Sequence, residues 1–210
     1  PCCRSAHFCH WSSSPLPGRC NSSRPKENIF GTLRVFCLGR DGKGGRLSAE
    51  VEEFLNGPVS GDELVRTLSA DGTVSCKVLS CTGLVGGACR LHGTSSSACV
   101  IFGRVLICAL LMAAGMKGSE TLQLQLRGTG SIGTVTSISD GAGRVRGCVG
   151  NARAVGTVAE VVGEGVVAVV RSGYGGIGYT GLTKIRSGQV AEDVAAYLWE
   201  SESRKVVVGA

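Results

Sequence analysis

The chain has 210 residues, 43% of them hydrophobic, and a net charge of +6, which suits one globular domain with an extension. Residues 1–50 carry eight Lys or Arg against three acids, a net charge of +5, whereas residues 51–210 carry fourteen against thirteen, a net charge of +1. The part that can fold is therefore almost neutral, which excludes the basic surface of a nucleic-acid-binding protein. We expect no nucleic-acid partner.

Residues 1–60 are predicted to be an organellar transit peptide or a disordered extension. They are rich in Ser and Arg and show no sustained hydrophobic periodicity. A metal site is the alternative, with candidate ligands Cys3, His7, Cys9 and His10. Because these residues lack the paired spacing of a zinc site, we favour the targeting segment. The destination would be the plastid stroma or mitochondrial matrix if residues 1–50 are a transit peptide, and the cytoplasm otherwise.

The first predicted elements of the folded part are a β-hairpin and a short helix. Two alternating runs, residues 62–70 and 73–80, flank Asp71-Gly72, and an Asp-Gly pair between such runs is the strongest short-range signal for a hairpin. Residues 83–92 then suit a short helix that contains a weakening pair of glycines. We interpret His92, a lone histidine at the end of this helix, as structural rather than catalytic.

A long apolar helix is predicted next. Thr94 or Ser95 can cap a helix that runs to about Met116. Residues 98–116 are nearly all apolar, so a membrane span is the alternative. Arg104 lies in the first third of the segment, and a charge in hydrocarbon is costly, so we favour a buried core helix. We expect no membrane partner.

Three short antiparallel strands should follow and form the rigid core of the fold. Residues 121–127 alternate between leucine and polar side chains, which is the period of a half-buried strand. A second alternating run extends to Ile138, where Asp140-Gly141 signals a turn. Residues 144–149 then predict the third strand of a meander.

The GxGxxG pattern of dinucleotide-binding proteins occurs twice, in residues 128–133 and 173–178. In those proteins the motif opens a helix, whereas residues 134–139 alternate like a strand and are partly β-branched. We therefore expect no dinucleotide cofactor and interpret the glycines as turn and bulge positions.

The C-terminal part is predicted to add two strands, residues 166–171 and 179–185, and an amphipathic helix capped by Ser187. The helix should bury Val190, Val194, Tyr197 and Leu198 and turn Glu192, Asp193 and Glu200 toward solvent. Residues 205–209 look like the start of another strand, so we expect the sequence to be incomplete. The predicted fold class is α+β, with antiparallel meander sheets packed with a buried central helix and a C-terminal amphipathic helix.

Eleven cysteines, an odd number without regular spacing, argue against a disulfide framework and for a reducing compartment. Cys99 and Cys108 lie in apolar company, where cysteine usually acts as a small buried hydrophobe. A thiol-based redox protein is the alternative, using Cys76, Cys81 or Cys148. Cys76 and Cys81 are five residues apart across a predicted turn and could pair.

Several segments resemble the heat shock protein 33 family of redox-regulated holdase chaperones. They are LVRTLSADGTVSCKV, the apolar segment from LHGTSSSACV to LRGTGSIGT, GRVRGCVGN and SGQVAEDVAAYLWESES. The likeness covers about residues 62–210. It implies that residues 61–210 are a substrate-binding domain that holds unfolded client proteins, prevents their aggregation under oxidative or heat stress, and forms a homodimer. In the family a linker and a small zinc domain follow.

The chain departs from the family in its cysteines. It contains no CxC or CxxC pair and no cysteine after Cys148, so the family's zinc ligands would lie beyond Ala210. The resemblance therefore implies zinc only in a missing C-terminal domain. We assign no catalytic, cofactor-binding or metal-binding residue in this chain, and the client-binding residues stay unassigned. Further departures from the family pattern are Cys148, Ala152 and Gln189.

Overall fold

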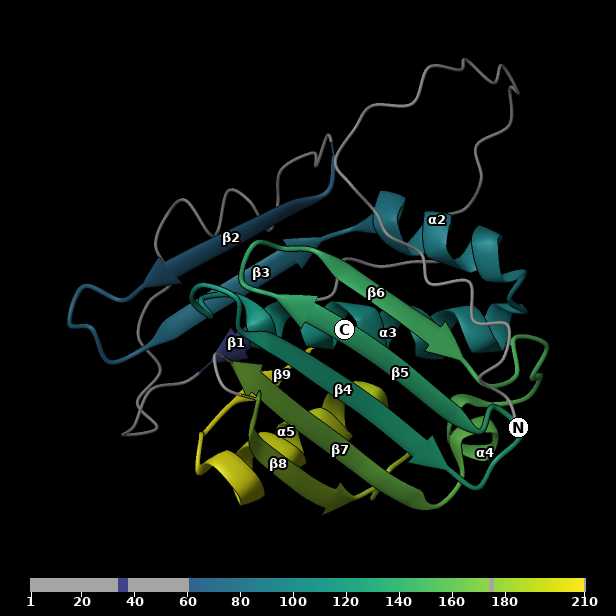
Figure 1. Cartoon of the computed structure of the whole chain (residues 1–210). Helices are drawn as coiled ribbons and strands as arrows, with labels where there is room; N and C mark the ends of the chain where they lie inside the picture. The colour runs from purple at the N-terminus through teal and green to yellow at the C-terminus, as the bar shows by residue number, and fades with distance from the viewer. Residues whose placement is uncertain (1–33, 38–60, 174–175, 210) are drawn as a thin grey trace.

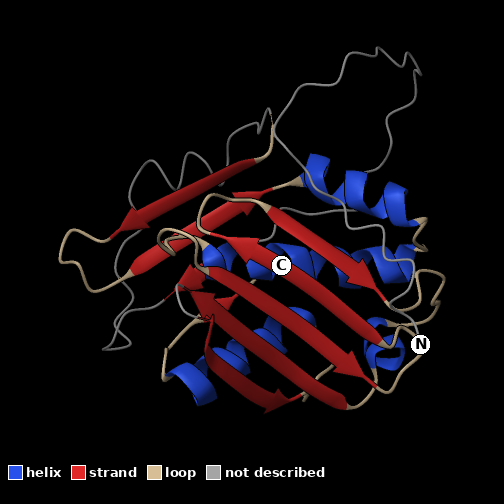
Figure 2. Cartoon of the chain, viewed as in Figure 1, coloured by secondary structure: helices blue, strands red, loops and turns tan. Residues whose placement is uncertain are grey.

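The computed structural model describes residues 61–173 and 176–209, together with the backbone of residues 34–37. Two antiparallel sheets and the helices packed against them make up the described fold (Figures 1 and 2). The predicted α+β class, with a buried central helix and a C-terminal helix, is therefore confirmed.

The larger sheet has five strands in the order β6-β5-β4-β7-β8. Its strands are β4 (Thr121–Gly128), β5 (Thr134–Asp140), β6 (Val145–Val149), β7 (Gly165–Gly173) and β8 (Gly176–Lys184). The predicted alternation in β4 is confirmed, because Leu122, Leu124 and Leu126 are at most 2% exposed. This leucine face lies against the helix α3 (Ser96–Ala113), while the helix α5 (Val190–Glu202) packs against β7 and β8 of the same sheet (Figure 1).

The smaller sheet has four strands in the order β2-β3-β1-β9. Its strands are β1 (Arg34–Cys37), β2 (Glu63–Leu68), β3 (Ser75–Ser80) and β9 (Val207–Val208). The predicted hairpin joins β2 to β3, and the Asp71 carboxylate accepts hydrogen bonds from the backbone and hydroxyl of Thr73 in its turn.

Strand β1 lies within the range predicted to be an extension, and sequence analysis did not anticipate it. It pairs antiparallel with β3 on one side and with β9 on the other. The rest of residues 1–60 lies outside the described residues. The transit-peptide prediction and the alternative ligands Cys3, His7, Cys9 and His10 therefore stay untested.

The central helix α3 (Ser96–Ala113) buries thirteen of its 18 residues. Ser95 caps its start by accepting a hydrogen bond from the Ala98 amide. At its other end Lys77 of β3 donates to the carbonyls of Leu111 and Ala114, at 3.0 and 2.7 Å. The helix is long and apolar enough to cross a membrane, but here it is packed as the core helix that we predicted.

The C-terminal helix α5 (Val190–Glu202) shows that one prediction was wrong. Asp193 is 1% exposed rather than solvent-facing. Its Oδ1 atom accepts hydrogen bonds from the amides of Arg186 and Ser187, at 2.8 and 3.1 Å. The carboxylate thus provides an acceptor for two backbone N–H groups of the loop that precedes the helix. The N-cap residue is Gln189 rather than Ser187.

Two glycines of the 128–133 motif, Gly128 and Gly130, let the backbone of this turn lie directly against the backbone of residues 160–162. No helix follows them, because β5 begins at Thr134 as predicted. The short helix α4 (Val158–Val162) ends against this turn, where Gly130 donates its amide to the carbonyl of Val162 at 3.0 Å. A Cβ atom on Gly128 would lie 1.9 Å from that same oxygen, so the space is filled by protein backbone.

Replacing Gly128 by alanine should therefore lower the free energy of unfolding by about 3 kcal/mol, because either β4 or the end of α4 must move. Urea denaturation measures this change. Gly61→Ala is the matched control, because nothing lies within 4 Å of its added Cβ atom. Equal stability of the two variants would contradict the close approach.

Candidate functional site: the groove between α2, α3 and β6

A groove of about 400 Å³ opens between helix α2 (Thr82–His92), α3 and β6. Most of its lining is apolar: Leu84, Ala88 and Leu91 from α2, Phe102 and Leu106 from α3, and Val145 and Gly147 from β6. Leu91 is 63% exposed at this groove. A volume of this size is in the range of ordinary ligand-binding pockets.

Gly147 allows β6 to approach the floor of the groove. A Cβ atom at this position would lie 2.9 Å from a ring carbon of Phe102 and 3.0 Å from a methyl carbon of Leu106. The ring of His92 meets Phe102 edge-on, with their centroids 5.0 Å apart. Burial lowers the pKa of His92, so the imidazole is neutral at pH 7 and extends the apolar lining. The predicted structural role of His92 is consistent with this contact.

Among the residues that the structure describes, the charged ones that line the groove are both basic, Arg90 and Arg146. A ligand with apolar side chains next to acidic ones would complement this lining, since opposite charges steer association.

Helix α2 forms one wall of the groove and contacts the core through one of its faces. Val85 and Cys89 are its buried residues. Val85 fits against Gly103 of α3, where an added Cβ would lie 2.7 Å from a Val85 methyl carbon. At the start of α2 the Asp62 carboxylate accepts hydrogen bonds from the amides of Gly83 and Leu84, at 2.8 and 2.6 Å. Asp62 thus replaces the cap that Cys81 does not supply.

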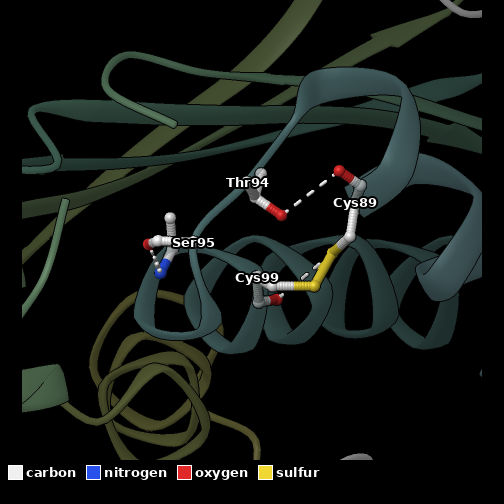
Figure 3. Close-up of a disulfide and its surroundings, with 5 residues drawn as sticks. Cys89, Thr94, Ser95 and Cys99 are labelled. Atoms are coloured by element: carbon white, nitrogen blue, oxygen red, sulfur yellow. Dashed lines mark hydrogen bonds between the residues drawn. A yellow bond between two sulfur atoms is a disulfide. The ribbon is translucent and has the colours of Figure 1, made fainter. Parts of the chain in front are cut away.

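A disulfide between Cys89 and Cys99 joins α2 to α3 (Figure 3). Gly93 ends α2 with φ 60°, and Thr94 then donates its amide and its hydroxyl to the Cys89 carbonyl. This turn folds α2 back on α3 and brings the two Cα atoms to 5.5 Å. The expectation that Cys99 is only a buried hydrophobe was wrong, because sequence spacing does not reveal a turn that brings two helices together.

Cys76 lies near the start of β3 and Cys81 directly follows the end of that strand, so extended chain rather than a turn separates the two. Five residues of strand span about 16 Å, whereas a disulfide needs Cα atoms within about 7 Å. Burial raises the pKa of the Cys81 thiol to about 12, and nearby Asp62 adds to this effect. The structure thus gives no support to a redox pair of Cys76 and Cys81.

Two further cysteines differ in their surroundings. Burial raises the pKa of Cys108 to about 12, and its 2% exposure confirms the predicted role as a small core side chain. Cys148 is partly exposed on β6 and forms no disulfide. Within the described residues, no group of three or more His, Cys, Asp or Glu side chains could hold a metal ion.

Comparison with known proteins identifies the family. Residues 62–209 match the family described as Hsp33 protein. The chain belongs to the Hsp33 family. This is a family of chaperones, not of enzymes.

Individual relatives agree with this assignment. The chain is 33% identical over 156 residues to the 33 kDa chaperonin of Streptococcus sanguinis, covering 70% of this chain and 54% of that protein. The 33 kDa chaperonin of Streptococcus equi subsp. equi is 34% identical over the same length. The crystal structure of the Hsp33 homologue of Thermotoga maritima matches with a TM-score of 0.61 and 27% identity, over 69% of this chain and 58% of that one. The chain thus spans about half the length of the curated relatives it matches.

The raised thiol pKa values predict which cysteines resist alkylation. At pH 8, iodoacetamide should label Cys81 and Cys108 about 1000-fold more slowly in the native chain than in urea, because a pKa of about 12 instead of 9 leaves a thousandth of the thiolate. Mass spectrometry of the labelled peptides measures this. Similar labelling rates in both states would contradict the burial.

The raised thiol pKa values of Cys81 and Cys108 also make the free energy of unfolding fall as the pH rises from 9 to 12, since the thiols of the unfolded chain lose their protons first.

Proposed function

We propose that residues 61–210 are the client-binding part of a holdase chaperone. Such a protein binds unfolded polypeptides and prevents their aggregation under oxidative or heat stress, without catalysing a reaction. Membership of the Hsp33 family carries this proposal. The apolar groove beside Leu91 supports it, because the hydrophobic effect is non-directional and therefore suits a binder of diverse clients.

The lining of the groove suggests which client segments bind there. Leucine, valine and phenylalanine side chains of an unfolded client can replace water over Leu91, which is exposed, and over Leu84 and Ala88, which are partly buried. Arg90, which is exposed beside Leu91, favours clients that carry acidic residues next to the apolar ones. A folded protein buries such apolar side chains, so the groove would select unfolded chains.

The finer features of the family are proposals for the full-length protein. They are redox regulation, zinc bound by cysteines beyond Ala210, and a homodimer. We also propose a reducing compartment, in the plastid stroma or mitochondrial matrix if the N-terminal segment is a transit peptide. The alternative of a thiol-based redox protein using Cys76 and Cys81 is disfavoured because the extended strand β3 separates these two residues.

Light scattering of a chemically unfolded client, diluted into buffer with the chain under reducing conditions, tests the proposal. The chain should suppress aggregation. Leu91→Ser should need about tenfold more protein for the same suppression, because a fully buried leucine contributes about 1.5 to 3 kcal/mol. Leu182→Ser is the matched control, since Leu182 is 60% exposed on β8, outside the groove.

Two results would overturn the proposal in different ways. A folded chain that leaves aggregation unchanged would contradict holdase activity for these residues. Equal suppression by Leu91→Ser and the unaltered chain would show that clients bind at another surface.

A further inference from the structure

Two adjacent glycines occupy the middle of α2, Gly86 and Gly87. Glycine is among the least favourable residues in the interior of a helix, so the pair weakens α2. Both positions border the groove. Gly86 lies beside the guanidinium of Arg90, and Gly87 is one of the residues that line the groove. The pair therefore shapes the wall of the groove.

Gly86 leaves space for the side chain of Arg90, which lies back along α2. A Cβ atom at position 86 would lie 3.3 Å from Nη1 of Arg90, so a side chain there would displace the guanidinium. Arg90 is exposed and lines the groove. Among the described residues, no side chain forms an ion pair or hydrogen bond with this guanidinium. It is therefore available to a carboxylate, which its planar shape matches.

Gly87 leaves an apolar channel along α2. The wall runs for about 10 Å, because Leu84 and Leu91 are seven residues apart and a helix rises about 1.5 Å per residue. Phe102 and Leu106 form the floor. Since Gly87 has no side chain, a hydrocarbon chain can lie close to the backbone of α2. The volume of about 400 Å³ is enough for a small ligand.

The groove is formed before a ligand enters. Near one end of α2, Val85 fits against Gly103 of α3. At the other end the ring of His92 meets Phe102 edge-on, and a hydrogen bond joins this imidazole to the backbone of Gly147. A ligand that binds between these two contacts does not have to order the wall, which favours affinity.

We propose that the groove binds a free medium-chain fatty acid anion such as decanoate. Its carboxylate pairs with Arg90, and its hydrocarbon chain lies against Gly87 between Leu84 and Leu91. An extended decanoate chain has about the length of this wall. The proposal adds a small ligand to the proposed function, and only a competition with clients for the groove rests on that function.

Isothermal titration calorimetry of the 210-residue chain with decanoate, below its critical micelle concentration, tests the proposal. One decanoate should bind per chain. Octanoate should bind about 15-fold more weakly, because each buried methylene group contributes a factor of about four in affinity. Decyltrimethylammonium has the same hydrocarbon chain with the opposite charge, and it should also bind more weakly than decanoate.

Two variants place the ligand in the groove. Gly87→Leu fills the channel and should weaken decanoate binding at least tenfold, while leucine favours the helix more than glycine does. Arg90→Gln should weaken decanoate binding about threefold, as expected for an exposed ion pair, without weakening the binding of decyltrimethylammonium. Arg153→Gln is the matched control, because Arg153 is exposed and does not line the groove. Thermal denaturation checks that each variant is folded.

Three outcomes would overturn the proposal. The first is equal affinity of decanoate for folded Gly87→Leu and for the unaltered chain. The second is an affinity that does not depend on the charge of the ligand. The third is the absence of saturable binding, with many decanoate molecules taken up by each chain.

The client assay separates this proposal from the proposed function. Saturating decanoate should reduce the suppression of client aggregation if clients occupy the same groove. A chain that binds one decanoate but never suppresses aggregation would contradict the holdase proposal and leave the fatty acid site standing. A chain that suppresses aggregation but does not bind decanoate would do the opposite.

Discussion

Both sheets and the other helices of the described fold pack around the buried helix α3. This helix contacts β3 of the smaller sheet, β4, β5 and β6 of the larger sheet, and α2, α4 and α5. Each fully buried Leu, Ile or Phe side chain contributes about 1.5 to 3 kcal/mol, whereas an exposed ion pair such as Arg144–Asp140 contributes about 0.5 kcal/mol. Residues of the neighbouring strands fit around α3. Lys77 of β3 donates hydrogen bonds to carbonyl groups at the end of the helix, and Gly147 of β6 has no side chain that would collide with Phe102.

Local patterns were enough to predict most of the described elements. The alternating leucines of β4 and the Asp71-Gly72 turn report on a few neighbouring residues, so a single sequence carries the information. The end of α3 was predicted about three residues too late, because the apolar pattern continues to Met116 whereas the backbone leaves the helix at Ala114, before Gly115 with φ 101°. The side of α5 on which Asp193 lies was also wrong. That carboxylate sits at the edge of the apolar face and binds the loop before the helix.

The candidate site was largely out of reach of sequence reasoning, because its parts come together only in the tertiary structure. The groove needs α2, α3 and β6 at once, and apolar residues in a sequence do not show which of them meet at a surface. Cys89 and Cys99 were hidden among eleven cysteines without a regular spacing. One contact had a usable sequence signal. Helix α2 begins at a cysteine, which is a poor N-cap residue, so an acidic side chain such as that of Asp62 could be expected to bind the first amides of the helix.

Strand β1 ties a segment near the start of the sequence to the smaller sheet. Residues 34–37 fill the gap between β3 and β9, so this short stretch joins the last described strand to the rest of the smaller sheet. A peptidase that removed all of residues 1–50 would leave β9 without this neighbour and expose the edge of β3. Cleavage after Cys37 would therefore separate the chain from a strand that the smaller sheet uses, whereas cleavage before Arg34 would leave all four of its described strands in place.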